Sequence, residues 1–237
     1  MRVFTHKSVR FAVGLPAAIA VSAGIGLSAT AVDAAASPRV AASPASAART
    51  SHAEQPGRLS KRLLDALLTK SDLPAGFATL TDPAKADPST VDACNKPIKP
   101  APDGKPADSV QVMFMKEKDN TVLFESLTAT GDKAARAVVA DYADAPRRCR
   151  AITLDKGDDE IRMTQFPLRV PRLGDAATGI RFVMKMKEPE TTMHGKMVVV
   201  ASGDISATIM VLGLTKPDQG EVEKIAAAAV EKLKPKE

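Results

Sequence analysis

The chain has 237 residues, a formal net charge of +5 and a hydrophobic content of 44%, which is enough apolar material for one ordinary folded domain. It has no Trp and one Tyr, so it lacks the aromatic platforms on which proteins that bind single-stranded nucleic acid stack the bases. Much of the net positive charge lies near the N-terminus and the remainder contains no basic block, so the charge pattern does not predict a nucleic-acid partner either.

The N-terminus has the three parts of a secretory signal peptide. Residues 2–10 carry three cations, residues 11–29 are mostly apolar, and small residues around 32–36 fit a cleavage site. We therefore expect a signal peptide at residues 1–36 and a secreted, extracellular protein with no stable membrane anchor after cleavage. A retained membrane span is the alternative, because about 20 apolar residues can cross a bilayer.

The segment after the predicted cleavage site, residues 37–57, is rich in Ala, Ser and Pro and has almost no large apolar side chain. Such a composition cannot bury enough surface to offset the entropy lost on ordering, so it predicts a disordered linker. Residues 58–237 then form a single domain. This domain is close to neutral, because the leader and the linker both carry more cations than acids.

The only two cysteines, Cys94 and Cys149, lie in the predicted domain. An even count in an exported protein favours a disulfide bond, and closing so long a loop is worth on the order of 4 kcal/mol in the chain-entropy model. A free nucleophilic thiol and a metal-binding pair are the alternatives. Neither cysteine has a C-x-x-C partner or a nearby His, which favours the disulfide.

The first predicted element is an amphipathic helix at residues 59–70, where apolar residues recur at the spacing of one helical face. Pro74 and Gly76 end the helical region, because Pro disfavours helical backbone in the residue before it and Gly can adopt a positive φ. A short strand is expected at residues 77–80. The Pro-rich stretch at 81–108 then predicts an ordered surface excursion that the first cysteine holds in place.

From Ser109 onward, apolar and polar residues alternate with period two, which indicates strands. Two further helices are predicted, one from Asp132 to just before Pro146 and one at residues 218–234. The predicted strands are 110–114, 121–130, 151–154, 161–166, 180–187, 193–201 and 205–214. These patterns predict an α+β fold in which an antiparallel sheet of five or six strands carries its helices on one face.

A hairpin near the C-terminus is rich in methionine. Period-two alternation places one apolar set on a single face, with Met186 predicted opposite Met193. That set is Phe182, Met184, Met186, Met193 and Met197. His194 is expected on the other face. We interpret the set as core beneath the C-terminal helix, where Met acts as a flexible filler; an apolar ligand pocket and a Cu(I) site with thioether and His194 ligands are the alternatives.

No catalytic motif is recognised in the predicted domain. His194 is its only His, and no G-x-S-x-G sequence accompanies it. The acidic run Asp158, Asp159 and Glu160 follows Gly157 and is interpreted as a solvated turn, in preference to a glycosidase pair or a calcium site. We therefore expect a protein that is not an enzyme and holds no cofactor or metal, with an enzyme of unrecognised type as a further alternative.

Several short segments together resemble a known group of domains. They are "LTKSDLPAGF", a Cys before the first long hairpin, a helix that ends before a second Cys, "LGDAATGIRF", "VVVASGDISATIMVLG" and a final amphipathic helix. This order resembles secreted and lipoprotein sensor-like domains of actinobacteria that are similar to the extracellular domain of the PknH serine/threonine kinase. The resemblance implies a non-catalytic sheet whose cleft binds an unidentified small molecule, lipid or cell-envelope component. The chain departs from that domain in having one Cys pair where the domain has two, and it has no kinase segment.

Overall fold

The computed structural model describes residues 56–98, 107–156, 159–187 and 190–234, which belong to one compact unit, Ala53–Glu237. The predicted signal peptide lies outside the described residues, as do nearly all of the predicted linker and Asp158 of the acidic turn. None of the described helices is long and apolar enough to cross a membrane.

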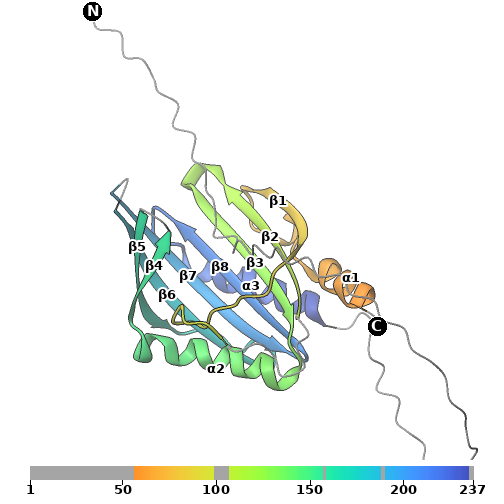
Figure 1. Ribbon diagram of the computed structural model, residues 1–237. Coiled ribbons are helices and arrows are strands. Elements are labelled where there is room, and N and C mark those ends of the chain that lie inside the picture. Colours follow the sequence, from red (N-terminus) through yellow and green to blue (C-terminus); the bar gives the residue numbers. More distant parts are fainter. Residues whose placement is uncertain (1–55, 99–106, 157–158, 188–189, 235–237) are drawn as a thin grey trace, which may run out of the picture. The chain divides into compact units, whose positions relative to one another are not determined.

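The unit is built on a single antiparallel sheet of eight strands in the order β1-β2-β3-β8-β7-β6-β5-β4 (Figure 1). The strands are β1 (Phe77–Ala86), β2 (Asp108–Lys116), β3 (Thr121–Ala129), β4 (Ala151–Lys156), β5 (Asp159–Leu168), β6 (Ala176–Met186), β7 (Thr191–Ser202) and β8 (Ile205–Gly213). The α+β class and the antiparallel sheet are confirmed. The predicted number of five or six strands is wrong, because the short segments at both edges extend and pair by backbone hydrogen bonds with the same sheet.

Three α-helices cover both faces of the sheet: α1 (Pro56–Ala66), α2 (Asp132–Arg148) and α3 (Gln219–Leu233). Helices α1 and α3 pack on one face, and α2 packs on the other, against β5 to β8 (Figure 1). The prediction that all helices lie on one face is therefore wrong. The physical reason lies in β7, where residues 198–201 are all fully buried, so both faces of that strand need a cover.

The face under α1 and α3 holds an aliphatic core. Its largest members are less than 2% exposed, and they are Leu63, Leu67, Leu68, Val110, Phe114, Leu123, Leu127, Ile209 and Ile225. The buried residues of α3 in this core are Val222, Ile225, Ala226, Ala229 and Val230, and Asp218 caps the helix by accepting a hydrogen bond from the Glu221 N–H. Gly76 has a φ of +98°, as expected of the residue that reverses the chain before β1.

Helix α2 ends three residues later than predicted and contains Pro146 in its last turn. A proline so near the C-terminal end removes only one helical hydrogen bond, and the Cys149 N–H still donates to the Ala145 carbonyl at 2.8 Å. The last turn carries Arg147 and Arg148, which suits the negative end of the helix dipole. The helix therefore delivers Cys149 directly to the segment that precedes β2.

The Sγ atoms of Cys94 and Cys149 are 1.94 Å apart, so the structure pairs the two cysteines as the sequence predicts. Neighbouring polar groups hold the same segment. The Ala93 N–H donates to Asp141 of α2 at 2.9 Å, and the buried Gln165 amide donates to the carbonyls of Ala93 at 3.2 Å and Cys149 at 3.4 Å. The covalent link and these hydrogen bonds together fix the segment against α2 and β5.

Candidate functional site

The face of the sheet under α2 collects the methionines. Cross-strand partners share a face, so the register can be followed from strand to strand. One row runs across five strands, from Met113 through Phe124, Met210 and Met197 to Ile180. A second row runs through Met163, Met184 and Met193 on β5, β6 and β7.

Residues two positions apart on a strand share a face, so two further methionines belong to the same side of the sheet. Met115 follows Met113 on β2, and Met186 follows Met184 on β6. The eight methionines are Met113, Met115, Met163, Met184, Met186, Met193, Met197 and Met210, and we refer to them as the methionine face. They are all the methionines of the chain except Met1. Five strands thus contribute the same residue type to one side of one sheet.

The predicted hairpin set is on this face, but two details differ. Its register is displaced by two residues: Met184 pairs with Met193, Phe182 with Gly195 and Ile180 with Met197. The shared face is preserved, because a shift of two residues returns every side chain to the same side. The helix that covers part of this face is α2, so the expectation that the methionines lie beneath the C-terminal helix is wrong.

Gly195 lets the Phe182 ring lie flat across β7. A Cβ added to Gly195 would be 2.1 Å from the Phe182 Cζ, closer than any real contact. The ring is 3% exposed and belongs to the core cluster under α2. A glycine at this position of a strand is therefore explained by close packing and not by backbone conformation.

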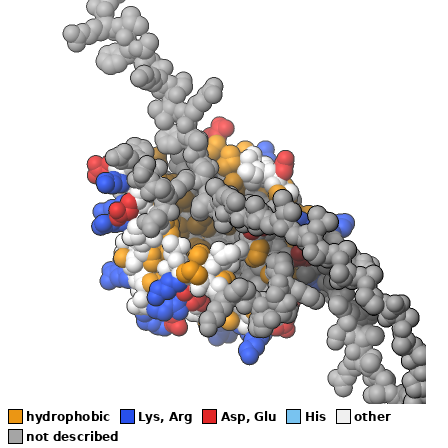
Figure 2. Space-filling model, in the orientation of Figure 1, with side chains coloured by type: hydrophobic (Ala, Val, Ile, Leu, Met, Phe, Trp, Pro, Cys, Tyr) orange, Lys and Arg blue, Asp and Glu red, His pale blue; other side chains and the backbone are white. Residues whose placement is uncertain are grey.

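Most of the methionine face is only half-buried. Met197 is the one buried member, at 9% exposure, and the other seven are intermediate. Val122, Phe124 and Leu212 on the same side are also half-buried. In Figure 2, which views the molecule as in Figure 1, hydrophobic side chains are visible in the middle of the surface and many charged groups lie around its edge. The face therefore combines apolar side chains with incomplete burial.

Tyr142 of α2 packs against the core cluster of this face. Burial raises the pKa of its phenol above the usual value, and the negative charges of Asp141 and Asp92 raise it further. The phenol is therefore neutral at physiological pH. It adds an uncharged polar group beside the apolar surface.

His194 lies on the opposite side of the sheet. It pairs with Val183, whereas its neighbours Met193 and Gly195 point to the methionine face. The side predicted for His194 is therefore confirmed. A copper site that needs both the hairpin thioethers and this imidazole would require ligands from two faces of one sheet.

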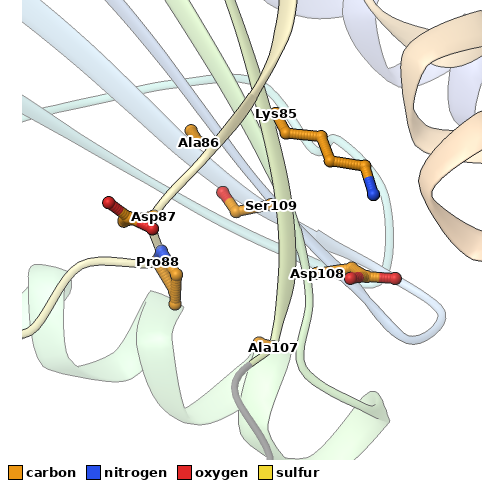
Figure 3. A pocket seen from close by; sticks show the side chains of 7 residues that line it. All are labelled: Lys85, Ala86, Asp87, Pro88, Ala107, Asp108 and Ser109. Atoms are coloured by element: carbon orange, nitrogen blue, oxygen red, sulfur yellow. The ribbon is translucent and has the colours of Figure 1, made fainter. Parts of the chain in front are cut away.

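A shallow depression of about 280 Å³ lies at the end of β1 and the start of β2 (Figure 3). It is lined by Lys85, Ala86, Asp87, Pro88, Ala107, Asp108 and Ser109. The side chains of Lys85 and Asp108 extend to one side in Figure 3, and Asp87 extends to the other. No methionine of the methionine face lines this depression, and the polar groups do not converge on one point as the groups of a catalytic site do.

Glu125 is a buried carboxyl that the sequence pattern does not reveal. It lies on β3 in the core under α1, with 0% exposure, and its Oε2 accepts a hydrogen bond from the Leu68 N–H at 2.7 Å. Its Oε1 has no hydrogen-bond partner among the described residues. Burial raises its pKa to about 7, although the Leu68 N–H and the charge of Lys232 act in the opposite direction.

The sequence also fails to assign Met113, Met115, Met163 and Met210 to the same surface as the hairpin methionines. The alternation within each strand is visible, and β2 and β3 pair as predicted. The missing information is the pairing of β3 with β8, which are separated by about 80 residues of chain and whose contact depends on the whole fold. One sequence feature could have indicated the shared surface: wherever a strand contains two methionines, they are separated by an even number of positions and therefore face the same side.

These features define a class of fold: one antiparallel sheet that is covered by helices on both faces. A solved structure of this class is the extracellular domain of PknH from Mycobacterium tuberculosis, with a TM-score of 0.55 and 16% sequence identity, covering 73% of this chain and 95% of that chain. The resemblance to PknH-like sensor domains that the sequence predicts is thus confirmed at the level of the fold.

A second solved structure, the Rv0999 ortholog from Mycobacterium smegmatis, aligns with a TM-score of 0.43 and 14% identity, covering 73% of this chain and 96% of that chain. No protein-family model matches the chain, and no curated protein matches its sequence.

Proposed function

We propose that this protein is a secreted, non-catalytic sensor-like module that binds an apolar ligand, such as a lipid, on the methionine face. The observation that carries the proposal is the gathering of all eight internal methionines on one half-buried side of the sheet. The fold likeness to an extracellular domain supports the extracellular location.

Methionine suits a surface of this kind for a physical reason. Its unbranched side chain has three rotatable bonds and a polarisable sulfur, so it can repack around apolar partners of different shape. A purely structural core would be expected to use side chains with fewer rotamers, and the opposite face of the same sheet does so with Leu, Val and Ile. The difference in residue type therefore favours binding as the role of the methionine face.

The test is fluorescence titration of the full-length chain with cis-parinaric acid, a long-chain fatty acid probe. The test variant is Met113→Gln/Met193→Gln, which keeps the length of the side chains and makes them polar. The matched control is Thr164→Gln/Val183→Gln, whose residues are half-buried like Met113 and Met193 but lie on the other side of the sheet. We expect the test variant to bind at least tenfold more weakly than the parent and the control to bind like the parent.

Equal affinities of test and control variants, or no binding by the parent, would contradict the proposal. A Cu(I) titration under reducing conditions separates the copper alternative. Tight stoichiometric Cu(I) binding by the parent that is lost in His194→Ala would contradict the apolar-ligand proposal and would identify a copper-binding protein. Native mass spectrometry of the exported protein should show a co-purified apolar molecule.

A further inference from the structure

The other side of β5, β6 and β7 carries a patch of cations, which we call the cationic face: Arg162, Arg181, Lys185 and Lys196. Arg162, Arg181 and Lys185 are exposed and Lys196 is half-buried. His194 lies on the same side, in the position between Lys196 and the strand end. The same three strands thus present methionine on one side and positive charge on the other.

The register brings like charges together. Arg162 pairs directly with Lys185, and Arg181 pairs directly with Lys196. Directly opposed residues on one face of a sheet have Cβ atoms about 5 Å apart, so each of these pairs is repulsive. A sheet that carries two such pairs side by side is less stable than one with neutral residues there, and a bound anion would offset the repulsion.

Internal counter-charges are scarce on this patch. Arg162 forms an ion pair with Glu160 at 2.6 Å. Within residues 56–98, 107–156, 159–187 and 190–234, no carboxylate lies within ion-pair distance of Arg181, Lys185 or Lys196. Three of the four cations therefore have no ion-pair partner in the described part of the chain.

An aromatic ring holds the edge of the patch in place. The Arg181 Cζ is 4.2 Å from the centroid of the Phe166 ring, and the Arg150 Cζ is 5.0 Å from it. Two guanidinium groups stacked on one half-buried ring are kept close to the sheet surface. The charges are thereby held near one plane and do not extend freely into solvent.

The described residues outside this patch leave most of it exposed. Helix α3 packs over β7 and β8, and Val170 in the connection after β5 contacts Gly179 near the far end of the sheet. The four cations of the cationic face lie outside the area that α3 and Val170 cover. No cavity among those the structure shows is lined by them. The patch is thus a two-dimensional array on an open sheet, without a pocket that would enclose one small anion.

We infer that the cationic face docks the protein on the surface of an anionic phospholipid bilayer. A planar array of phosphate groups matches a planar array of cations, and Lys and Arg side chains near such a surface each add to the attraction. Docking in this way leaves the methionine face on the side away from the bilayer surface. The inference rests on charge and register, and it does not depend on what the methionine face binds.

The experiment is co-sedimentation of the full-length chain with vesicles of phosphatidylglycerol and phosphatidylcholine in equal amounts. Pure phosphatidylcholine vesicles serve as the uncharged baseline, and the control variant, which keeps residues 1–55, measures what the cations of those residues contribute to binding of the anionic vesicles. The test variant is Arg181→Glu/Lys196→Glu. The matched control is Lys133→Glu/Lys224→Glu, which makes the same change of net charge at exposed positions on α2 and α3.

We expect the parent to bind the anionic vesicles at least tenfold more strongly than the neutral ones in 50 mM salt, and to lose most of this preference in 300 mM salt. The test variant should lose the preference and the control should keep most of it. A circular-dichroism melt checks folding, and Arg181→Gln/Lys196→Gln, which removes repulsion without adding acids, should show an intermediate loss.

Three results would overturn the inference. The first is a parent that does not distinguish the two kinds of vesicle. The second is an equal loss in the test and control variants, which would mean that net charge alone matters. The third is tighter binding to soluble heparin than to the vesicles in the same salt, which would identify a polyanionic glycan as the partner of this face.

Discussion

The two faces of the central sheet differ in how completely they are packed. Under α1 and α3, the residues that point inward are branched aliphatic or aromatic, and the largest are less than 2% exposed. Under α2, buried Ile180, Phe182 and Val199 lie beside methionines of which all but Met197 are half-buried. A single sheet thus separates a surface that supplies stability from one that keeps conformational freedom, and substitutions on the two sides should have different costs.

The largest difference should appear between Leu123 and Met113, which lie on adjacent strands and opposite faces. Leu123 is 0% exposed, so Leu123→Ala should lower the free energy of unfolding by about 2 to 5 kcal/mol. Met113 is half-buried, and Met113→Ala should cost about 1 kcal/mol or less. Urea unfolding of both variants measures the contrast. Equal costs would show that the methionine face is an ordinary core.

The disulfide bond ties the segment before β2 to the end of α2, on the methionine side. Replacing both cysteines, Cys94→Ser/Cys149→Ser, removes the covalent restriction of the unfolded chain and should lower the free energy of unfolding by about 2 to 4 kcal/mol. Thermal unfolding should show a melting temperature lower by several degrees. Peptide mapping without reducing agent provides the control, and alkylation of both thiols in the untreated parent would contradict the pairing.

Glu125 makes the stability of the α1 side depend on pH. The pKa is about 7 in the folded protein and 4.5 for an ordinary Glu, so the folded state holds a proton that the unfolded state releases. This contribution to stability is fully present below pH 4.5 and is lost as the pH rises through about 7. Glu125→Gln should therefore stabilise the protein at pH 8 by up to about 3 kcal/mol and have little effect at pH 4.

Denaturant unfolding of the parent and Glu125→Gln at both pH values provides the measurement. Asp65→Asn, which changes an exposed carboxyl on α1, is the control and should leave the pH dependence as it is in the parent. A parent whose stability is the same at pH 4.5 and pH 8, once the control is subtracted, would be inconsistent with a raised pKa of Glu125.

The smallest of these effects concerns Gly195 beneath the Phe182 ring. Gly195→Ala should cost about 1 to 3 kcal/mol, because the new methyl group overlaps the ring and displaces it. In Phe182→Leu, where the ring is absent, the same Gly195→Ala change should cost less. A double-mutant cycle by urea unfolding measures the coupling between the two positions. Additive costs would mean that the ring and the glycine do not restrict each other.

Local patterns in the sequence were sufficient for most of the elements. The strand from Thr121 to Ala129, the hairpin from Ala176 to Ser202 and the helix from Gln219 to Leu233 lie close to their predicted positions, because period-two and period-3.6 patterns reflect which side of each element is buried. The pairing of Cys94 with Cys149 could be predicted because the chain has only two cysteines. The side of the sheet was predicted correctly for His194, because a register shift of two residues does not change the side that each residue faces.

The tertiary structure alone decided how these elements combine. Alternation within β3 and within β8 says nothing about their pairing, so Met113 and Met210 joined the hairpin methionines only when the sheet was assembled. Local patterns also could not assign the helices to two faces, because each amphipathic helix needs an apolar surface and β7 offers one on either side. The burial of Glu125 has the same origin: its strand position predicts a side of the sheet, and only the packing of α1 on that side removes the carboxyl from water.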